Sequence, residues 1–315
     1  MTERILALQP LTTEQRERLA KANVEIVDAA DWKSAEPITV IFGWDPEVGP
    51  AALMAPNNQV RWIQTTSAGI DYLPLDWIRA HDIAVTNASG AFSPAIAEST
   101  IGYLLYFLRG FNEAVKNQAG HFWQRPLRSD LAMIGSQTIV IYGTGSIGQA
   151  IAKLLNGFGN QPIGVNRTGH DVPGFQSAVS LDDDSSVIKD ADIIINAMPA
   201  TTKTVGYFNE RFFKQLDGLR IFVNVGRGKS VDEKALMNAL LYQNVLHVAL
   251  DVFETEPLPK TSRLWDYPNV LITPHQTGFA KDDEKPIFDM FMKNLQGWLA
   301  DGKLTVNVTN PTQGY

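Results

Sequence analysis

Arg227, Glu256 and His275 stand at or just beyond the ends of three short apolar runs in the second half of the chain. If these runs are parallel strands, their carboxyl ends lie on the edge of a sheet where ligands bind. An arginine there can bind a carboxylate, and a histidine can donate a proton. A glutamate beside the histidine favours the imidazolium form, which is the acid. We therefore expect these residues to bind a small acid and to protonate it.

The composition excludes several other chemistries. The chain has no Cys, and its five His show no HExxH spacing, so disulfides, thiolate metal sites and Cys nucleophiles are excluded and we expect no metal site. A formal net charge of -7 argues against nucleic acid as a partner. No run approaches about eighteen apolar residues, and the start of the chain lacks the pattern of a signal peptide. We expect a cytoplasmic protein without a membrane span.

A glycine-rich turn follows the apolar run 138–142 and precedes an amphipathic helical pattern. It reads Gly143-Thr144-Gly145-Ser146-Ile147-Gly148. Between a strand and a helix, the first Gly permits the tight turn, the second lets the backbone approach a pyrophosphate, and the third allows close helix–strand contact. The N-terminus of the helix then binds the anion. The pattern predicts a bound dinucleotide, with a glycine-rich turn that binds no ligand as the alternative.

The end of the next expected strand, 162–165, bears on which dinucleotide binds. An NAD-selective site usually carries Asp or Glu here, which accepts hydrogen bonds from the ribose hydroxyls. This chain has Asn166, Arg167 and Thr168, and all three can donate to a 2′-phosphate that a carboxylate would repel. We therefore expect NADP, with NAD as the weaker alternative. In that alternative, Arg167 stacks on the adenine or lies in solvent.

Short β-rich runs alternate with helical patterns along the whole chain, which indicates an α/β fold with parallel sheets. The expected strands are 5–8, 38–42, 60–64 and 83–86 in a first set, and 138–142, 162–165, 193–196, 220–225, 247–252 and 270–273 in a second. The second set is sufficient for a Rossmann-type doubly wound parallel sheet, and the first predicts a smaller flavodoxin-like α/β domain.

Two longer helical patterns flank the second set. One runs from about 95 to 118 and is expected to be a spacer between domains, and the other places apolar residues of 287–299 on one stripe. We expect that stripe to pack on the first set of strands. Residues 1–94 and 284–315 would then form a substrate (catalytic) domain, and residues 95–283 a dinucleotide-binding domain.

The order of these motifs resembles the D-isomer-specific 2-hydroxyacid dehydrogenase family, over nearly the whole chain. Further similar segments are 66–71, 191–193, 231–233, 264–265 and 268–270. The resemblance implies that Arg227 binds the substrate carboxylate and polarises the 2-oxo group. It also implies that His275 donates the proton as hydride leaves the nicotinamide, and that Glu256 hydrogen-bonds the other imidazole nitrogen.

The same resemblance implies a set of supporting residues. The backbone N–H groups of Ser67, Ala68 and Gly69 would hold the substrate carboxylate in a small nest, with an ordinary turn as the alternative. The residues implied along the nicotinamide half of the cofactor are Met198, Pro199, Val225, Gly226 and Asp251. Asp251 would accept from the carboxamide, or it would be a structural carboxylate that caps nearby backbone.

Two segments depart from the family pattern. They are 134–137, before the glycine-rich turn, and Gln276-Thr277-Gly278, after the histidine. Neither departure removes a catalytic group, but both put the transfer of a substrate preference in doubt.

We therefore expect an enzyme that uses NADP(H) to reduce a small 2-oxo acid, such as glyoxylate or hydroxypyruvate, to the D-2-hydroxy acid. A second copy of the chain is the expected partner, because the aromatic segment 122–125 lies where members of the family commonly dimerise. One alternative is an NADP-sensing corepressor or scaffold on the same fold. Another is an NAD-dependent phosphoglycerate dehydrogenase-like enzyme, which is disfavoured because the chain ends without room for the regulatory domain that many such enzymes carry.

Overall fold

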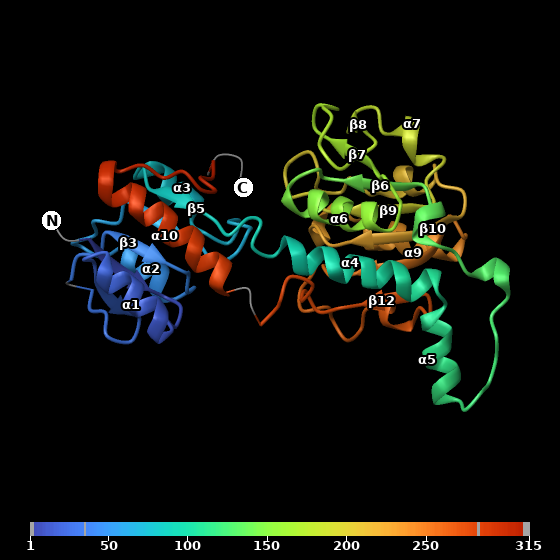
Figure 1. Ribbon diagram of the computed structural model, residues 1–315, viewed down its shortest axis with the longest axis horizontal. Helices are drawn as coiled ribbons and strands as arrows, with labels where there is room; N and C mark the ends of the chain where they lie inside the picture. The colour runs from blue at the N-terminus through green and yellow to red at the C-terminus, as the bar shows by residue number, and fades with distance from the viewer. Residues whose placement is uncertain (1–2, 35, 282–283, 311–315) are drawn as a thin grey trace. The chain divides into compact units, whose positions relative to one another are not determined.

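The computed structural model describes residues 3–34, 36–281 and 284–310, and it divides the chain into two compact units (Figure 1). Unit 1 comprises Met1–Phe92 together with Ala280–Tyr315, and unit 2 comprises Ser93–Phe279. The second boundary expected from the sequence, between 283 and 284, falls partly on residues 282 and 283, which lie outside the described residues.

Among the described residues of unit 1, five parallel strands form one sheet in the order β2-β1-β3-β4-β5. The strands are β1 (Arg4–Ala7), β2 (Glu25–Asp28), β3 (Val40–Phe42), β4 (Trp62–Gln64) and β5 (Ala84–Thr86). This is the flavodoxin-like order that the sequence predicts. The strand β2 was not predicted from the sequence, because it is an edge strand whose residues are partly exposed and which lacks a continuous apolar run.

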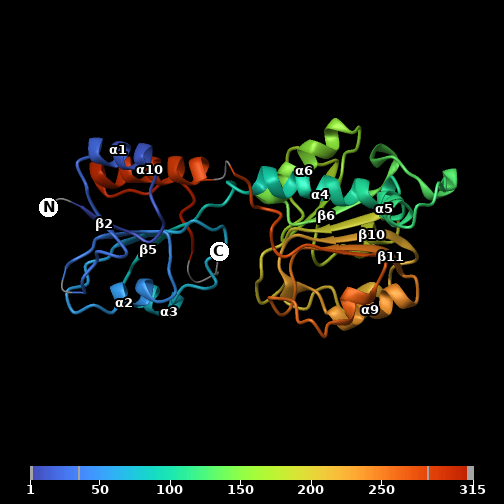
Figure 2. The ribbon, with the colours of Figure 1, turned by 90° about the horizontal axis from the view of Figure 1, so that it is seen from below.

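Helices cover both faces of this sheet (Figure 2). The helices α1 (Thr13–Lys21) and α10 (Glu284–Asp301) lie on one face, and α2 (Val48–Leu53) and α3 (Leu75–Ala80) lie on the other. The helix α10 buries Phe288, Phe291 and Leu295 against Phe42 and Trp62 of the strands. The expected packing of this last helix on the first set of strands is therefore confirmed.

Unit 2 is described throughout, and its seven parallel strands have the order β12-β11-β10-β9-β6-β7-β8. The strands are β6 (Ile139–Tyr142), β7 (Ile163–Asn166), β8 (Ser177–Ser180), β9 (Ile193–Asn196), β10 (Leu219–Asn224), β11 (Val245–Leu250) and β12 (Val270–Ile272). With β6 counted as the first strand, this is the Rossmann order. Successive strands extend the sheet on one side of β6 as far as β8, and on its other side from β9 onwards. The edge strand β8 was not predicted, because it is short, polar at both ends and partly exposed.

The helices of unit 2 complete the doubly wound arrangement. They are α4 (Ser93–Leu108), α5 (Phe111–Ala119), α6 (Ser146–Gly157), α7 (Ser185–Ile188), α8 (Glu210–Phe213) and α9 (Glu233–Leu241). Figure 2 shows α4 and α6 on one face of the sheet and α9 on the other. Each face has its own apolar core, so both sides of the sheet are dry.

The prediction of one long helix over 95–118 is wrong in two respects. Helix α4 ends at Leu108, the chain turns at Gly110, which has a φ of 67°, and a second helix, α5, begins at Phe111. In addition, α4 is no mere spacer, because Leu104 and Phe107 are buried in the core of unit 2. The apolar periodicity runs on through the break, and a single Gly inside such a pattern does not by itself end a helix.

Among the described residues, no helix combines the length and the apolar character needed to cross a membrane.

Candidate active site

The glycine-rich turn connects β6 to α6, and its glycines have different roles. Gly143 has a φ of 92°, and a Cβ on Gly148 would lie 2.0 Å from the carbonyl oxygen of Gly143. These two positions therefore have no room for a side chain. A Cβ on Gly145 would meet nothing within 4 Å, and Gly145 caps the N-terminus of α6. The backbone there is open to a phosphate group, as the binding of a pyrophosphate at a helix N-terminus requires. Thr144, Ser146 and Ile147 complete the turn.

The loop after β7 is organised by Asn166, which is buried. Its Nδ2 donates to Thr144 Oγ1 at 3.2 Å and to the carbonyl oxygen of His170 at 2.8 Å. Its Oδ1 accepts from the backbone N–H groups of Thr168 and Gly169. Both amide hydrogens of Asn166 are thus engaged within the protein. The side chain shapes the turn and joins it to the glycine-rich turn.

The exposed groups of this loop are the side chains of Arg167, Thr168 and His170. His170 was not among the residues predicted to bind the cofactor. It lies beside Thr168 because the chain turns back at Gly169, where φ is 73°, and His170 Nδ1 is 2.8 Å from Thr168 Oγ1. Its position three residues after Arg167 places it near the predicted cofactor-binding residues in the sequence. That spacing alone does not show how the loop folds.

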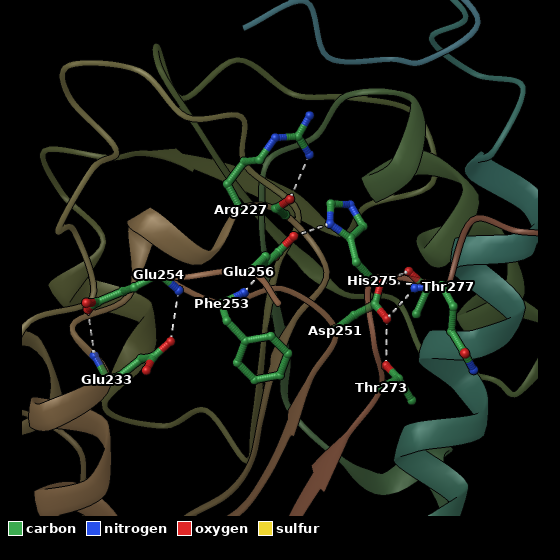
Figure 3. Close-up of polar contacts among 11 residues, drawn as sticks. Arg227, Glu233, Asp251, Phe253, Glu254, Glu256, Thr273, His275 and Thr277 are labelled. Carbon is green, nitrogen blue, oxygen red and sulfur yellow. Dashed lines mark hydrogen bonds and ion pairs between the residues drawn. The ribbon is translucent and has the colours of Figure 1, made fainter. Parts of the chain in front are cut away.

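The structure brings His275 and Glu256 together as the resemblance implied (Figure 3). His275 Nδ1 lies 2.7 Å from Glu256 Oε2, and Glu256 Oε1 accepts from the backbone N–H of Phe253 at 2.9 Å. The carboxylate is therefore fixed by the loop that carries it. With Nδ1 facing Glu256, the second ring nitrogen, Nε2, is left for a substrate.

Arg227 follows β10 and lies beside the loop that carries Glu256. A Cβ on Gly228 would lie 1.8 Å from the carbonyl oxygen of Phe253, so the two loops touch backbone to backbone at a position that only glycine permits. Arg227 donates from Nη1 to the carbonyl oxygen of Gly226 at 2.9 Å. Among the described residues, no carboxylate forms an ion pair with it. Arg227 thus offers a cation without a charged partner within the protein.

Two glutamates clamp the same loop to α9. The backbone N–H of Glu254 donates to Glu233 Oε1 at 2.8 Å, and the backbone N–H of Glu233 donates to Glu254 Oε1 at 3.1 Å (Figure 3). Burial raises the pKa of Glu233, and the hydrogen bond that its carboxylate accepts from the backbone N–H of Glu254 offsets part of this rise. This reciprocal pair was not predicted from the sequence.

Asp251 lies at the end of β11 and is 1% exposed. Its carboxylate accepts from Thr273, Gln276 and Thr277, on both sides of His275. His275 itself has a φ of 52°, the left-handed region that residues other than Gly rarely adopt.

The predicted nicotinamide-side residues lie at the ends of β9 and β10. The backbone N–H of Met198 donates to Asn196, that of Gly226 donates to Asn224, and the two Asn side chains are joined at 2.9 Å. Pro199 and Val225 lie next to these residues in the chain. Asn196 and Asn224 are fully buried and were not predicted. They hold these two strand ends in register.

The substrate-binding residues predicted in unit 1 form a turn after β4. The carbonyl oxygens of Ser67, Ala68 and Gly69 accept from neighbours in unit 1, and Ser67 Oγ lies 2.7 Å from Tyr72 Oη. The N–H groups of these three residues make no hydrogen bond to a described residue. They can therefore serve as donors to an anion, as the nest requires. Tyr72 was not predicted, and burial raises its pKa.

Two of the other histidines stack on aromatic side chains. His81 stacks on Trp77 at 4.1 Å, and His247 stacks on Phe107 at 4.7 Å. Burial lowers the pKa of His247, which favours its neutral form. His121 is exposed in the segment after α5.

Comparison with known proteins identifies the family. Residues 101–277 match the family model described as D-isomer specific 2-hydroxyacid dehydrogenase, NAD binding domain. The glyoxylate reductase/hydroxypyruvate reductase of Mus musculus is 30% identical over 295 residues, which are 86% of this chain and 87% of that protein.

Two solved structures are similar over almost their whole length. A D-isomer specific 2-hydroxyacid dehydrogenase family protein from Aeromonas salmonicida is 29% identical with a TM-score of 0.85, covering 99% of this chain and 100% of its own. A phosphoglycerate dehydrogenase from Lactobacillus plantarum is 35% identical with a TM-score of 0.60, covering 98% of this chain and 100% of its own. The family model spans more than half of the chain, and the chain belongs to the D-isomer specific 2-hydroxyacid dehydrogenases, which are NAD(P)-dependent oxidoreductases.

Proposed function

We propose that this protein reduces a small, unphosphorylated 2-oxo acid to the D-2-hydroxy acid with NADPH. The observation that carries the proposal is the His275–Glu256 pair at 2.7 Å, beside the loop of Arg227 and in the same unit as the open glycine-rich turn. A nicotinamide cofactor supplies the hydride when it is bound.

Each of the three residues has one task in this reaction. Arg227 binds the carboxylate of the substrate and polarises its 2-oxo group. His275 gives the proton on Nε2 to the carbonyl oxygen as that oxygen gains electron density. Glu256 accepts from Nδ1, which orients the ring and leaves Nε2 for the substrate. Reversal of the same steps oxidises the hydroxy acid.

The preference for NADPH rests on the loop after β7. Arg167, Thr168 and His170 are exposed there, and the strand ends in an amide, where NAD-selective sites usually have a carboxylate. Because the side chain of Asn166 is engaged within the loop, we assign the contact with the 2′-phosphate to Arg167 and to its two exposed neighbours. Met198, Pro199, Val225 and Gly226 remain the proposed neighbours of the nicotinamide half. The carboxylate of Asp251 is buried and already accepts four hydrogen bonds from residues around His275, which favours the structural role that was the alternative for it.

Exchange of Arg167 tests the cofactor preference. The variant Arg167→Ala should lose about tenfold or more in affinity for NADPH, because a charge-assisted contact with the 2′-phosphate is removed while the contacts of Asn166 that shape the loop are kept. Affinity for NADH should change little. Equilibrium binding by protein fluorescence measures both, and Arg167→Lys, which keeps the charge, is the control. Equal losses for the two cofactors would refute the assignment.

An unphosphorylated substrate is favoured by the loops of unit 1. The residues after β1, β3, β4 and β5 are 8–12, 43–47, 65–74 and 87–92, and none of them is Lys or Arg. These loops lie at the carboxyl ends of the strands, where such sheets bind ligands. A phosphate group would need cations there. Glyoxylate and hydroxypyruvate need none beyond Arg227.

The 35% identity to a phosphoglycerate dehydrogenase makes that activity the second candidate. That solved chain is covered completely. The lack of room for a regulatory domain, which was expected to disfavour this activity, therefore does not separate the two candidate activities.

An NADPH-oxidation screen with glyoxylate, hydroxypyruvate, phenylpyruvate, branched 2-oxo acids and 3-phosphohydroxypyruvate, repeated with NADH, decides between these activities. We expect turnover of an unphosphorylated acid. Turnover of the phosphorylated acid alone would refute our proposal, and binding of NADPH without any turnover would favour a sensor or scaffold.

We further propose a homodimer formed through α5 and the segment that follows it. Phe122 and Trp123 are 69% and 94% exposed, and Leu127 and Met133 are also exposed. Exposed apolar groups in this number along one segment are typical of an interface. Sedimentation should give twice the chain mass, and Trp123→Glu should shift the protein towards the monomer. A wild-type monomer at micromolar concentration would contradict the dimer.

A further inference from the structure

The backbone of His275 requires an explanation that the contact with Glu256 does not provide. Its φ of 52° lies in the left-handed region, where a side chain with a Cβ is disfavoured. Such a conformation persists when the surroundings hold it in place, and it is often found where function needs one exact position.

Asp251 provides most of the answer (Figure 3). Its Oδ1 accepts from Thr273 Oγ1 at 2.6 Å and from the backbone N–H of Gln276 at 2.9 Å. Its Oδ2 accepts from the backbone N–H and the Oγ1 of Thr277, at 3.1 and 2.5 Å. The backbone N–H of His275 donates to the carbonyl oxygen of the same Asp251 at 2.9 Å. A carboxylate has about four acceptor sites, and here the residues around His275 fill them.

A buried tyrosine extends this network to the helix α4. Tyr103 Oη lies 2.5 Å from Thr273 Oγ1. Because Thr273 uses its own hydrogen to donate to Asp251, the tyrosine must be the donor of this contact. Burial raises the pKa of Tyr103, so the hydroxyl keeps its proton at neutral pH. The chain of donors thus runs from Tyr103 through Thr273 to Asp251.

We propose that Thr277 and Tyr103 are positioning residues for the proton donor, acting through Asp251. They fix the carboxylate from two sides, the carboxylate fixes the left-handed turn, and the turn sets where the imidazole meets Glu256. Thr277 belongs to the segment in which this chain departs from the family pattern. This inference rests on the proposed role of His275 as the acid.

The decisive comparison is Thr277→Val against Thr277→Ser. Valine has the shape of threonine but no hydroxyl, whereas serine keeps the hydroxyl. We expect Thr277→Val to lower kcat by about 10- to 100-fold, because small displacements of a reacting group cost that much, and to leave the Kd for NADPH unchanged within about twofold. Thr277→Ser should restore most of kcat. Tyr103→Phe, one contact further away, should lower kcat by about three- to tenfold.

The matched control is Thr100→Val in the same helix as Tyr103. Thr100 is buried, and its Oγ1 donates to the carbonyl oxygen of Ile96 at 2.8 Å, away from this network. Loss of this hydroxyl should leave kcat unchanged. An equal fall in kcat for Thr100→Val and Thr277→Val would mean that any buried hydroxyl matters, and would overturn the proposal.

A readout without turnover separates this inference from the proposed function. The chain has five His, so imidazole ¹⁵N spectra are simple, and His275→Gln identifies the signal of His275. The signal should shift in Thr277→Val and Tyr103→Phe and return in Thr277→Ser. A wild-type protein that reduces no 2-oxo acid would refute the proposed function. Unchanged His275 signals and unchanged kcat in both variants would refute the positioning role.

Discussion

The loops at the carboxyl ends of the strands differ sharply between the two units. In unit 2 they carry Arg227, Glu256 and His275, and these are held by buried polar groups such as Asp251. In unit 1 the corresponding loops after β1, β3, β4 and β5 carry no Lys or Arg in the described residues, and their turn at Ser67 is held through backbone carbonyls. Both sheets have the parallel, doubly wound design, so the architecture alone does not account for the difference. The proposed function accordingly assigns the reacting charges to unit 2 and neutral donors to unit 1.

The strongest test of this division is the removal of the proton donor from unit 2. His275→Ala should lower the rate of 2-oxo acid reduction by about a thousandfold, within the range typical of a general acid. Binding of NADPH should remain nearly intact, because His275 is not among its proposed contacts. Steady-state kinetics and fluorescence titration measure the two quantities. Near-normal turnover would show that the reacting charges lie elsewhere.

A change in unit 1 should have a smaller effect and a different signature. Ser67→Ala removes the hydroxyl that donates to the carbonyl oxygen of Gly69 and contacts Tyr72. A loosened turn should raise KM for the 2-oxo acid by about three- to tenfold with little change in kcat, as expected when a neutral binding contact is weakened. Ser67→Thr, which keeps the hydroxyl, is the control. A fall in kcat as large as that of His275→Ala would erase the distinction between the units.

The smallest effect concerns the clamp in unit 2, and it depends on pH. The raised pKa of Glu233 means that its charged form is disfavoured in the folded protein, chiefly because the carboxylate is partly buried. This penalty is absent below the ordinary pKa of a glutamate and grows as pH rises through the raised value. Glu233→Gln keeps an oxygen to accept from the N–H of Glu254. It should therefore raise Tm by about 1–2 °C at pH 8.

At pH 4 the same substitution should change Tm little, because the wild-type carboxyl is then largely protonated in the folded and unfolded states alike. Differential scanning calorimetry at the two pH values measures both shifts. A lower Tm at pH 8, or an equal gain at pH 4, would contradict the sign of the effect.

The buried strands and the three polar residues at their ends were predictable, because both leave local patterns. Strands such as 193–196 are continuous apolar runs, and the polar residue that follows a run stands out from it. The edge strands β2 and β8 were missed, because they face solvent and mix polar with apolar residues. The break at Gly110 was missed, because the apolar period continues across it.

The groups that hold the candidate site were harder to predict for a different reason. Tyr103 meets Thr273 across 170 positions of sequence. No periodicity relates two such residues, and a tyrosine on a buried helix face reads as core. The same holds for the contact between Asn196 and Asn224, which follows from the pairing of β9 with β10. Partners of this kind are fixed by the three-dimensional fold and leave no signal along the chain.

Gly228 has a consequence for how such an enzyme can change its substrate over evolution. Because its missing side chain lets the loop of Arg227 rest on the carbonyl oxygen of Phe253, the span from the cation to the histidine pair is set by main chain. Ordinary side-chain substitutions cannot lengthen or shorten that span gradually, and any residue larger than glycine at 228 would disturb it at once. The separation between a carboxylate and its neighbouring carbonyl is the same in every 2-oxo acid. If Arg227 and His275 bind that shared part, as we propose, differences in substrate range come from residues outside these two loops.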